Sequence, residues 1–262
     1  MLIIGERINT SRPDIKRAVE TKDANFIQEE VRRQKEAGAL MIDVNSGSNP
    51  DTEVDDMLWL IDIIQEAAEI PLCIDSPNFA VLEQAMRSAR GRALLNSVTA
   101  EKSRYEKILP ICKEFDCDII CLTMDEKGMP ATSKERFEIA TIMMEICSKY
   151  QISKDRLYFD PLVRPVSSEQ GQAMEFLGAI KMMKSLGLKT IAGLSNVSFG
   201  LPKRRLLNRT FLSMACSYGL DACIVDPLDS TLMSAITASS AILGHDNYCK
   251  EYLEAFRAGK LG

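Results

Sequence analysis

One stretch decides the fold, because it carries an apolar run into a polar turn: Ile191-Ala192-Gly193-Leu194-Ser195-Asn196-Val197-Ser198. The run shows no helical period, which predicts a buried strand. After the turn, basic residues open a helical pattern, Arg204-Arg205-Leu206-Leu207-Asn208-Arg209-Thr210-Phe211. A parallel α/β protein presents its chemistry in this way, on side chains at the C-terminal end of a strand. Taken alone, the stretch is more simply an ordinary turn in which Asn196 caps backbone groups.

The rest of the chain repeats the same unit. Eight short apolar runs occur: Leu2–Ile4, Leu40–Val44, Leu72–Asp75, Ala93–Asn96, Ile119–Thr123, Leu157–Asp160, Thr190–Leu194 and Ala222–Val225. Helical patterns between them include Asp23–Ala37, Val54–Ala68, Phe79–Ser88, Tyr105–Phe115, Ser133–Lys149, Ala173–Leu186, Leu206–Tyr218 and Ser230–Leu243. Eight such units in 262 residues, without a linker, predict one α/β domain over 1–262, a (β/α)8 TIM barrel with a closed parallel sheet. A doubly wound open sheet is the alternative.

Composition narrows the function classes. Apolar residues make up 46% and charged residues 26%, with a net charge of −5. The chain therefore offers no basic stripe for nucleic acid. No apolar run reaches the length of a membrane span. The N-terminus enters a strand directly rather than a signal peptide, so we expect a cytoplasmic protein.

Cysteine and histidine usage argues against a metal centre. The eight cysteines form no Cys-x-x-Cys pair and fall on both strand and helix patterns, so free buried thiols are expected. His245 is the single histidine, which removes most metal sites and most serine or cysteine nucleophile systems based on histidine. No Gly-x-Gly-x-x-Gly or Walker loop appears. We expect no metal and no nucleotide site.

Polar residues end each predicted strand. In a barrel these ends meet at one face, where active sites are built. The residues there include Glu6, Asn9, Asp43, Asn45, Asp75, Asn96, Asp125, Asp160, Asn196 and Asp226. Any one Asp or Asn in such a place is more often a cap or turn residue. Eight polar ends together predict a polar pocket at the barrel mouth.

Asp75, Asn96 and Asp160 would converge from three strands on one cavity. Carboxylates accept hydrogen bonds and can accept two parallel ones, which suits a flat heterocycle rich in N–H donors. The pterin ring fits through its 2-amino group and N3–H. Two aspartates could instead be a glycosidase pair or a Mg²⁺ site. The sugar alternative is weak, because aromatic content is 6% and Trp59 falls on a helix.

Several motifs together resemble a known family. They are Gly5-Glu6-Arg7-Ile8-Asn9, Asp43-Val44-Asn45, Cys73-Ile74-Asp75-Ser76, Asn96-Ser97, Asp160-Pro161-Leu162, Gly193 to Ser198 and Leu207-Asn208-Arg209-Thr210-Phe211. Their order and spacing resemble the methyltetrahydrofolate:corrinoid protein methyltransferases. The resemblance runs through all eight units. It implies a pterin-binding barrel, usually a homodimer, that moves a methyl group between N5 of tetrahydrofolate and the cobalt of a corrinoid on a separate protein.

The resemblance also implies roles for individual residues. Asp75, Asn96 and Asp160 would hold the pterin ring, while Asn196 approaches N5 with Gly193, Ser195 and Arg204 nearby. For Glu6, Asn9, Asp43 and Asn45, substrate contact and a structural network at the rim stay equally open. The loop Phe199-Gly200-Leu201-Pro202 departs from the acetogenic enzymes, where it is more polar.

The implied reaction sets a requirement at N5. A tertiary amine is a poor leaving group, so N5 must gain positive charge or a strong hydrogen bond as its bond to the methyl carbon breaks. We expect Asn196 to accept a hydrogen bond from protonated N5 in the transition state of an in-line displacement. Stabilisation found only there raises the rate rather than the affinity.

Two rival functions remain. Dihydropteroate synthase has a similar pocket, but it needs a lysine after strand 7 and an Arg/His pair after strand 8 for pyrophosphate. Here the corresponding residues are Ser195-Asn196 and Asp226-Pro227-Leu228-Asp229, which disfavour it. A folate-binding scaffold subunit without catalysis is the second rival.

Overall fold

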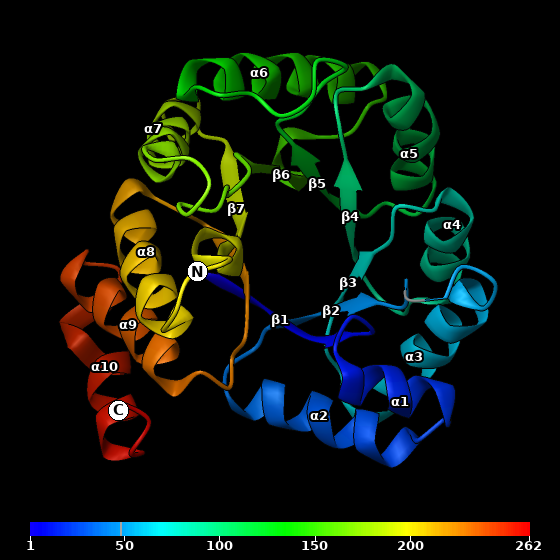
Figure 1. Ribbon diagram of the computed structural model, residues 1–262, viewed down its shortest axis with the longest axis horizontal. Coiled ribbons are helices and arrows are strands. Elements are labelled where there is room, and N and C mark those ends of the chain that lie inside the picture. The colour runs from blue at the N-terminus through cyan, green and yellow to red at the C-terminus, as the bar shows by residue number, and fades with distance from the viewer. Residues whose placement is uncertain (48) are drawn as a thin grey trace.

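The computed structural model describes residues 1–47 and 49–262 and contains a closed sheet of eight parallel strands (Figure 1). The strands are β1 (Leu2–Asn9), β2 (Met41–Asn45), β3 (Leu72–Asp75), β4 (Leu94–Val98), β5 (Asp118–Leu122), β6 (Leu157–Asp160), β7 (Lys189–Gly193) and β8 (Ala222–Val225). Each pairs with the next, and β8 pairs with β1 to close the ring. The predicted TIM barrel is confirmed.

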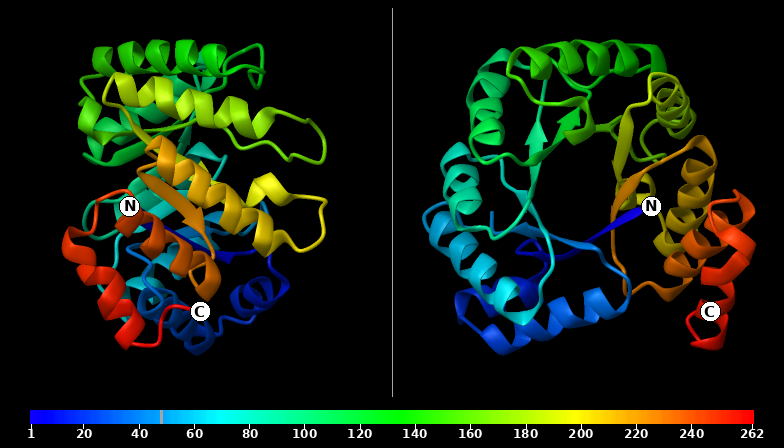
Figure 2. Two further views of the ribbon diagram at one scale, coloured as in Figure 1. Left: turned by 90° about the vertical axis from the view of Figure 1, so that its left-hand side faces the viewer. Right: turned by 180° about the vertical axis from the view of Figure 1, so that it is seen from behind.

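Helices surround the sheet, as Figure 1 and the right-hand view of Figure 2 show. The α-helices are α1 (Pro13–Glu20), α2 (Ala24–Glu36), α3 (Glu53–Ala67), α4 (Phe79–Ser88), α5 (Lys102–Glu114), α6 (Ser133–Lys149), α7 (Gln172–Ser185), α8 (Arg204–Tyr218), α9 (Ser230–Ile242) and α10 (Lys250–Arg257). Three 3₁₀ segments join them: η1 (Lys154–Arg156), η2 (Leu194–Ser198) and η3 (Asn247–Cys249). The sequence did not predict α1 or α10. The latter lies outside α9 and buries no residue.

Helix starts follow from capping residues. Asp23 accepts a hydrogen bond from the backbone N–H of Phe26 at the start of α2. Thr132 and Glu135 form a capping box at α6. Each such cap stabilises a helix by about 1 kcal/mol, because it satisfies backbone donors that have no partner inside the helix.

Side chains alternate along each strand between the barrel interior and the helices. The interior set is apolar near the amino ends of the strands and consists of Ile4, Met41, Cys73, Leu94, Ile120, Ile191 and Ala222. Residues one position along, such as Ile42, Ile74 and Ile119, belong to the larger core under the helices. This alternation fixes which residues of the opposite end can face the mouth.

Two element boundaries differ from the prediction in ways that matter for the site. Strand β1 continues to Asn9 with a register shift between Gly5 and Ile8, so Glu6 lies inside the strand. Strand β7 ends at Gly193, and the chain then forms η2 rather than an open turn. Polar residues can end a strand here because the barrel mouth is open to water.

The cysteines are free, as predicted. Seven of the eight are buried, and Cys249 is exposed. The single histidine, His245, is also exposed. Cys73 lies in the barrel interior.

Candidate active site

The apolar interior of the barrel gives way to polar side chains toward the carboxyl ends of the strands. Moving two residues along a strand keeps a side chain on the same face. From the interior set this step leads to Glu6, Asp43, Asp75 and Asn96, with Gly193 in the equivalent place on β7, and from Tyr158, which packs against that set, it leads to Asp160. Asp75 and Asn96 are direct neighbours in the β3–β4 register. The structure therefore brings these predicted site residues together at one end of the barrel.

Asn45 fixes the orientation of Asp75. The backbone N–H of Gly47 donates to Asn45 Oδ1 at 3.0 Å, so the amide nitrogen must point the other way. There Asn45 Nδ2 donates to Asp75 Oδ2 at 2.9 Å. In the described part of the chain, Oδ1 of Asp75 takes no hydrogen bond and remains available as an acceptor.

A second amide is fixed in the same manner. Asn96 Nδ2 donates to Asp43 Oδ1 at 3.3 Å, and its amide also contacts the Cys73 thiol. The sequence reasoning did not assign any role to Cys73. The amide oxygen of Asn96 is then the atom left for another partner.

Asp160 is held by backbone donors. The N–H of Leu162 donates to Asp160 Oδ1 at 2.7 Å, and Gly193 supplies a second backbone hydrogen bond. Leu162 itself has a left-handed backbone (φ 65°). A carboxylate can accept about four hydrogen bonds, so Asp160 keeps acceptor capacity for a ligand.

Burial raises the pKa values of these carboxyl groups. Loss of hydration raises the pKa of Asp43 to about 8, and the nearby charge of Asp75 adds to the effect. The pKa of Asp75 is also raised by burial, against the stabilising bond from Asn45. Burial raises the pKa of Asp160 to about 6, and its backbone donors oppose that rise. At neutral pH, Asp160 is mostly charged and Asp43 mostly neutral.

A hydrogen bond that holds the residue after Asp75 was not predicted from the sequence. Glu53, in the first turn of α3, is 6% exposed and accepts a hydrogen bond from Ser76 Oγ at 2.6 Å. Ser76 directly follows Asp75 and is itself buried. Its place after a strand was the available signal, but nothing in the spacing pointed to Glu53 as the partner.

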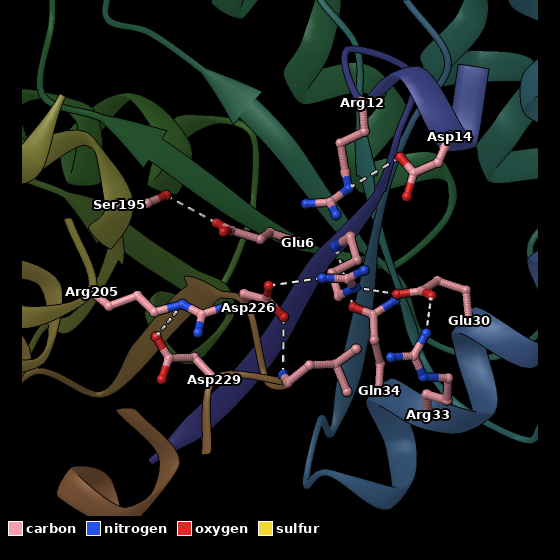
Figure 3. Close-up of polar contacts among 12 residues, drawn as sticks. Glu6, Arg12, Asp14, Glu30, Arg33, Gln34, Ser195, Arg205, Asp226 and Asp229 are labelled. Carbon is pink, nitrogen blue, oxygen red and sulfur yellow. Dashed lines mark hydrogen bonds and ion pairs between the residues drawn. The ribbon is translucent and has the colours of Figure 1, made fainter. Parts of the chain in front are cut away.

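On the opposite side of the mouth, Ser195 joins η2 to β1. Ser195 Oγ donates to Glu6 Oε2 at 3.1 Å (Figure 3). Burial raises the pKa of Glu6, and the bond from Ser195 opposes the rise. Asn196 follows on η2 with an exposed side chain. Ser195 and Asn196 are thus presented together at the end of β7.

Arg204 holds η2 in place from the start of α8. Its Nη2 donates to the carbonyl oxygen of Ser195 at 2.7 Å, and its Nε donates to Ser198 Oγ at 3.0 Å. The neighbouring Arg205 instead lies 3.5 Å from Asp229 Oδ2 (Figure 3). Arg204 therefore contacts the segment that carries Asn196, while Arg205 points to the acidic turn after β8.

The rim at β1 is a structural network. Arg7 pairs with Glu30 of α2 and, through Nη1, with Asp226 Oδ2 at 2.9 Å. Figure 3 shows Asp226 and Glu30, the two partners of Arg7, together with the Glu6–Ser195 contact. Asn9 Oδ1 accepts from the N–H of Ser11 at 2.9 Å, as a turn residue does. The structure holds Arg7 in an ion-pair network and Asn9 in a turn, while substrate contact by Asn9 stays a prediction.

A cavity of about 30 Å³ lies between Glu6, Ser195, Asn208, Asp226 and Asp229. That volume is large enough for one water molecule. Asn208 Oδ1 is buried there without a hydrogen-bond partner among the described residues. A bound water would supply the missing donor and touch the polar groups behind η2.

The loops before α7 and α8 lie at the same end of the barrel (Figure 2) and are bonded to each other. The N–H of Val166 donates to the carbonyl of Val197 at 3.1 Å. Ser167 Oγ donates to the carbonyl of Phe199 at 2.7 Å. Phe199 itself is 64% exposed, a few residues from Asn196. The loop Phe199-Gly200-Leu201-Pro202 is thus hydrogen-bonded to the loop before α7 and forms a partly apolar part of the rim.

Within 1–47 and 49–262, no group of three or more His, Cys, Asp and Glu side chains is arranged to hold a metal ion. In the same residues, no helix has both the length and the apolar character needed to cross a membrane.

The comparison with protein families places the chain. Residues 5–226 match the family described as pterin binding enzyme, and the chain belongs to that family. It is 37% identical to a methylcorrinoid:tetrahydrofolate methyltransferase of Eubacterium limosum, across 100% of this chain and 98% of that protein. It is also 29% identical to the methionine synthase of Mycobacterium leprae, and this match covers 86% of this chain but 20% of that longer protein.

Solved structures agree on the fold. A dihydropteroate synthase of Xanthomonas albilineans with 4-aminobenzoic acid superposes with a TM-score of 0.73 at 18% identity, covering 94% of this chain and 92% of the other. A dihydropteroate synthase of Yersinia pestis gives 0.72 at 17% identity, covering 93% and 94%. At these identities the likeness concerns the barrel alone.

Proposed function

We propose that this protein is a methyltransferase that moves a methyl group between N5 of tetrahydrofolate and the cobalt of a corrinoid carried on a separate protein. Two observations support the proposal: the full-length similarity to a methylcorrinoid:tetrahydrofolate methyltransferase, and the chemistry of the mouth. One observation carries it. Asp75, Asn96 and Asp160 come from three strands and offer acceptor oxygens at one end of the barrel.

This arrangement suits a pterin. The N3–H and 2-amino groups of the ring are donors on one edge, and a carboxylate that accepts both gains a charge-assisted, bidentate contact. Asp160 is the carboxylate we assign to that edge, because backbone donors hold it and its pKa of about 6 leaves it charged at neutral pH. Asp75 and Asn96 would accept from the remaining ring N–H groups.

Asn196 is the residue we assign to N5. When bound, the corrinoid supplies a cobalt(I) nucleophile for the methyl group. The protein's own part is to orient the pterin and to stabilise N5 as it leaves. The Asn196 amide oxygen can accept a hydrogen bond from N5–H once solvent has protonated N5, and when the bond to the methyl carbon breaks its electron pair returns to N5, which leaves as a neutral secondary amine. Ser195, Glu6 and Arg204 hold the segment that carries Asn196.

The corrinoid protein partner is inferred from the open mouth of the barrel. A corrinoid on a separate protein must reach N5 from outside the barrel, so its carrier docks over the rim that includes Phe199. We further propose that the chain acts as one pterin-binding domain in a homodimer. Positioning of two reactants in line is the main task left to the protein, and good positioning can lower a barrier by about 7–11 kcal/mol.

The dihydropteroate synthase alternative is disfavoured. That reaction releases pyrophosphate, whereas the turn after β8 carries Asp226 and Asp229 at the mouth. Arg7 and Arg205 are each engaged by these acidic side chains. An anionic leaving group would meet like charges in this place.

Spectroscopy tests the proposal directly. Purified protein is mixed with methyltetrahydrofolate and a cobalt(I) corrinoid, and methylcobalt formation is followed in the visible spectrum. We expect formation with the native protein and with Asp62→Asn, an exposed control on α3, and little with Asp160→Asn. A native protein that binds the folate but forms no methylcobalt would favour the scaffold function instead.

A further inference from the structure

The amide of Asn96 has two ends with opposite chemistry, and only one of them can face a ligand. Its hydrogen-bond partners decide which end that is. In this site the nitrogen has a partner. Asn96 Nδ2 donates to Asp43 Oδ1 at 3.3 Å, which leaves the oxygen for the mouth.

Asp43 is well placed to enforce this choice. It lies on β2 with its side chain in the barrel interior and is 4% exposed. Its carboxyl group accepts hydrogen bonds in both protonation states, because a neutral carboxyl keeps its carbonyl oxygen as an acceptor. Asn96 therefore finds an acceptor at this position whatever the charge of Asp43.

The groups around Asp43 explain why an acid is held so deep in the barrel. Cys73 and Asp75 approach it from β3, Asn96 from β4 and Glu6 from β1. None of these groups is a cation, and no ion pair is formed by Asp43 within residues 1–47 and 49–262. Burial of a carboxyl without a cation costs stability, which a purely structural position would avoid by using an apolar residue.

We propose that Asp43 is a positioning residue that sets the specificity of the pterin site by turning the amide oxygen of Asn96 toward the ligand. The site then presents acceptors at Asp75, Asn96 and Asp160 alike, and it selects a ring edge made of N–H donors. With the amide reversed, one donor would face another. The inference rests on the proposed function and assigns a specificity role within that same site.

The test is a double-mutant cycle with two replacements at Asp43. Asp43→Leu removes the acceptor, and Asp43→Asn keeps an acceptor oxygen for Asn96. Binding of methyltetrahydrofolate is measured by calorimetry for the native protein, both variants, Asn96→Ala, and the double variant Asp43→Leu/Asn96→Ala. Thermal melting of each protein confirms that it is folded.

We expect Asp43→Leu to bind about ten- to a hundredfold more weakly, the loss produced by an unpaired buried polar group. Asp43→Asn should recover most of the affinity. Asp43→Leu should add almost nothing once Asn96 is alanine, because the two residues act through one contact. Additive losses, or equal losses for the Leu and Asn variants, would overturn the proposal.

A readout without folate separates this inference from the proposed function. The Asn96 side-chain amide is assigned in a ¹⁵N-correlated NMR spectrum by its loss in Asn96→Ala. Its proton shifts should move in Asp43→Leu and stay near native values in Asp43→Asn. If the native protein binds no folate, the proposed function fails while this result still decides the Asp43–Asn96 contact. An unchanged amide signal in Asp43→Leu would refute the contact itself.

Discussion

Replacing Asp160 by asparagine tests the assignment of the pterin edge most sharply. The substitution keeps the shape of the side chain and one acceptor for the backbone N–H of Leu162. It exchanges the charged acceptor for a neutral amide whose NH₂ would oppose a ligand N–H. Loss of a charge-assisted hydrogen bond is worth about 1.5–3 kcal/mol, and an unsatisfied donor adds about 1–3 kcal/mol. Together these predict folate binding weaker by about a hundredfold to about twenty thousandfold.

The pH dependence of folate binding gives a second, independent measure of how much the charge of Asp160 contributes to affinity. Burial raises the pKa of Asp160 to about 6, so protonation removes the carboxylate below that value. Only about one tenth of the sites stay charged at pH 5, and almost all are charged at pH 8. We therefore expect the native affinity for methyltetrahydrofolate to fall about tenfold from pH 8 to pH 5, while Asp160→Asn shows no such slope.

Isothermal calorimetry at pH 5, 6, 7 and 8 measures both effects. Asp62→Asn, exposed on α3, is the matched control, and it should follow the native curve. Titration of the ligand itself appears equally in all three proteins and so cancels in the comparison. The reasoning is refuted if Asp160→Asn binds as tightly as the native protein, or if its pH profile runs parallel to the native one.

Three other outcomes follow from the site. Asn196→Ala should lower the rate of methyl transfer by about a hundredfold with little change in folate Kd; stopped-flow spectroscopy and calorimetry compare the two, and equal losses would discard its role at N5. Burial raises the pKa of the Asp43 carboxyl group to about 8, so between about pH 4 and pH 8 the folded protein binds a proton that the unfolded chain has released. The stability that this group contributes below about pH 4 is therefore lost as the pH rises through 8. Urea unfolding should show this decline flattened in Asp43→Asn, and parallel curves would contradict it. Phe199→Ala should raise the KM for the corrinoid protein several-fold in steady-state assays, without changing folate affinity; a change in folate affinity instead would assign Phe199 to the folate tail.

The barrel could be predicted because its signal is repeated eight times. Each strand is a short apolar run, and each run is followed by a helix long enough to show its period. The helices α1 and α10 were not predicted, because they add no strand and do not interrupt the strand–helix repeat. The α10 helix in particular buries no residue, so little in its pattern reflects the core.

Convergence of the polar strand ends was predictable, but the division of work among them was not. Parity along a strand places Asp43 and Asp75 on the same side of the sheet, as the structure confirms. Which amide nitrogen faces which carboxylate depends on the stagger between neighbouring strands and on the turn at Gly47. The Glu53–Ser76 contact likewise joins α3 to the end of β3, and sequence spacing carries no signal for it.

Closure of the sheet pairs the first and last strands of the barrel, which are the farthest apart in the sequence. Strand β1 pairs with β8, and Arg7 bonds to Asp226, 219 positions later. At about 5–20 residues per second, a ribosome takes roughly ten to forty seconds to make the intervening chain. During that interval one edge of β1 has no strand to pair with, and unpaired edges of this kind invite association with other chains. The nascent chain therefore keeps one edge of β1 unpaired until its final strand emerges from the exit tunnel.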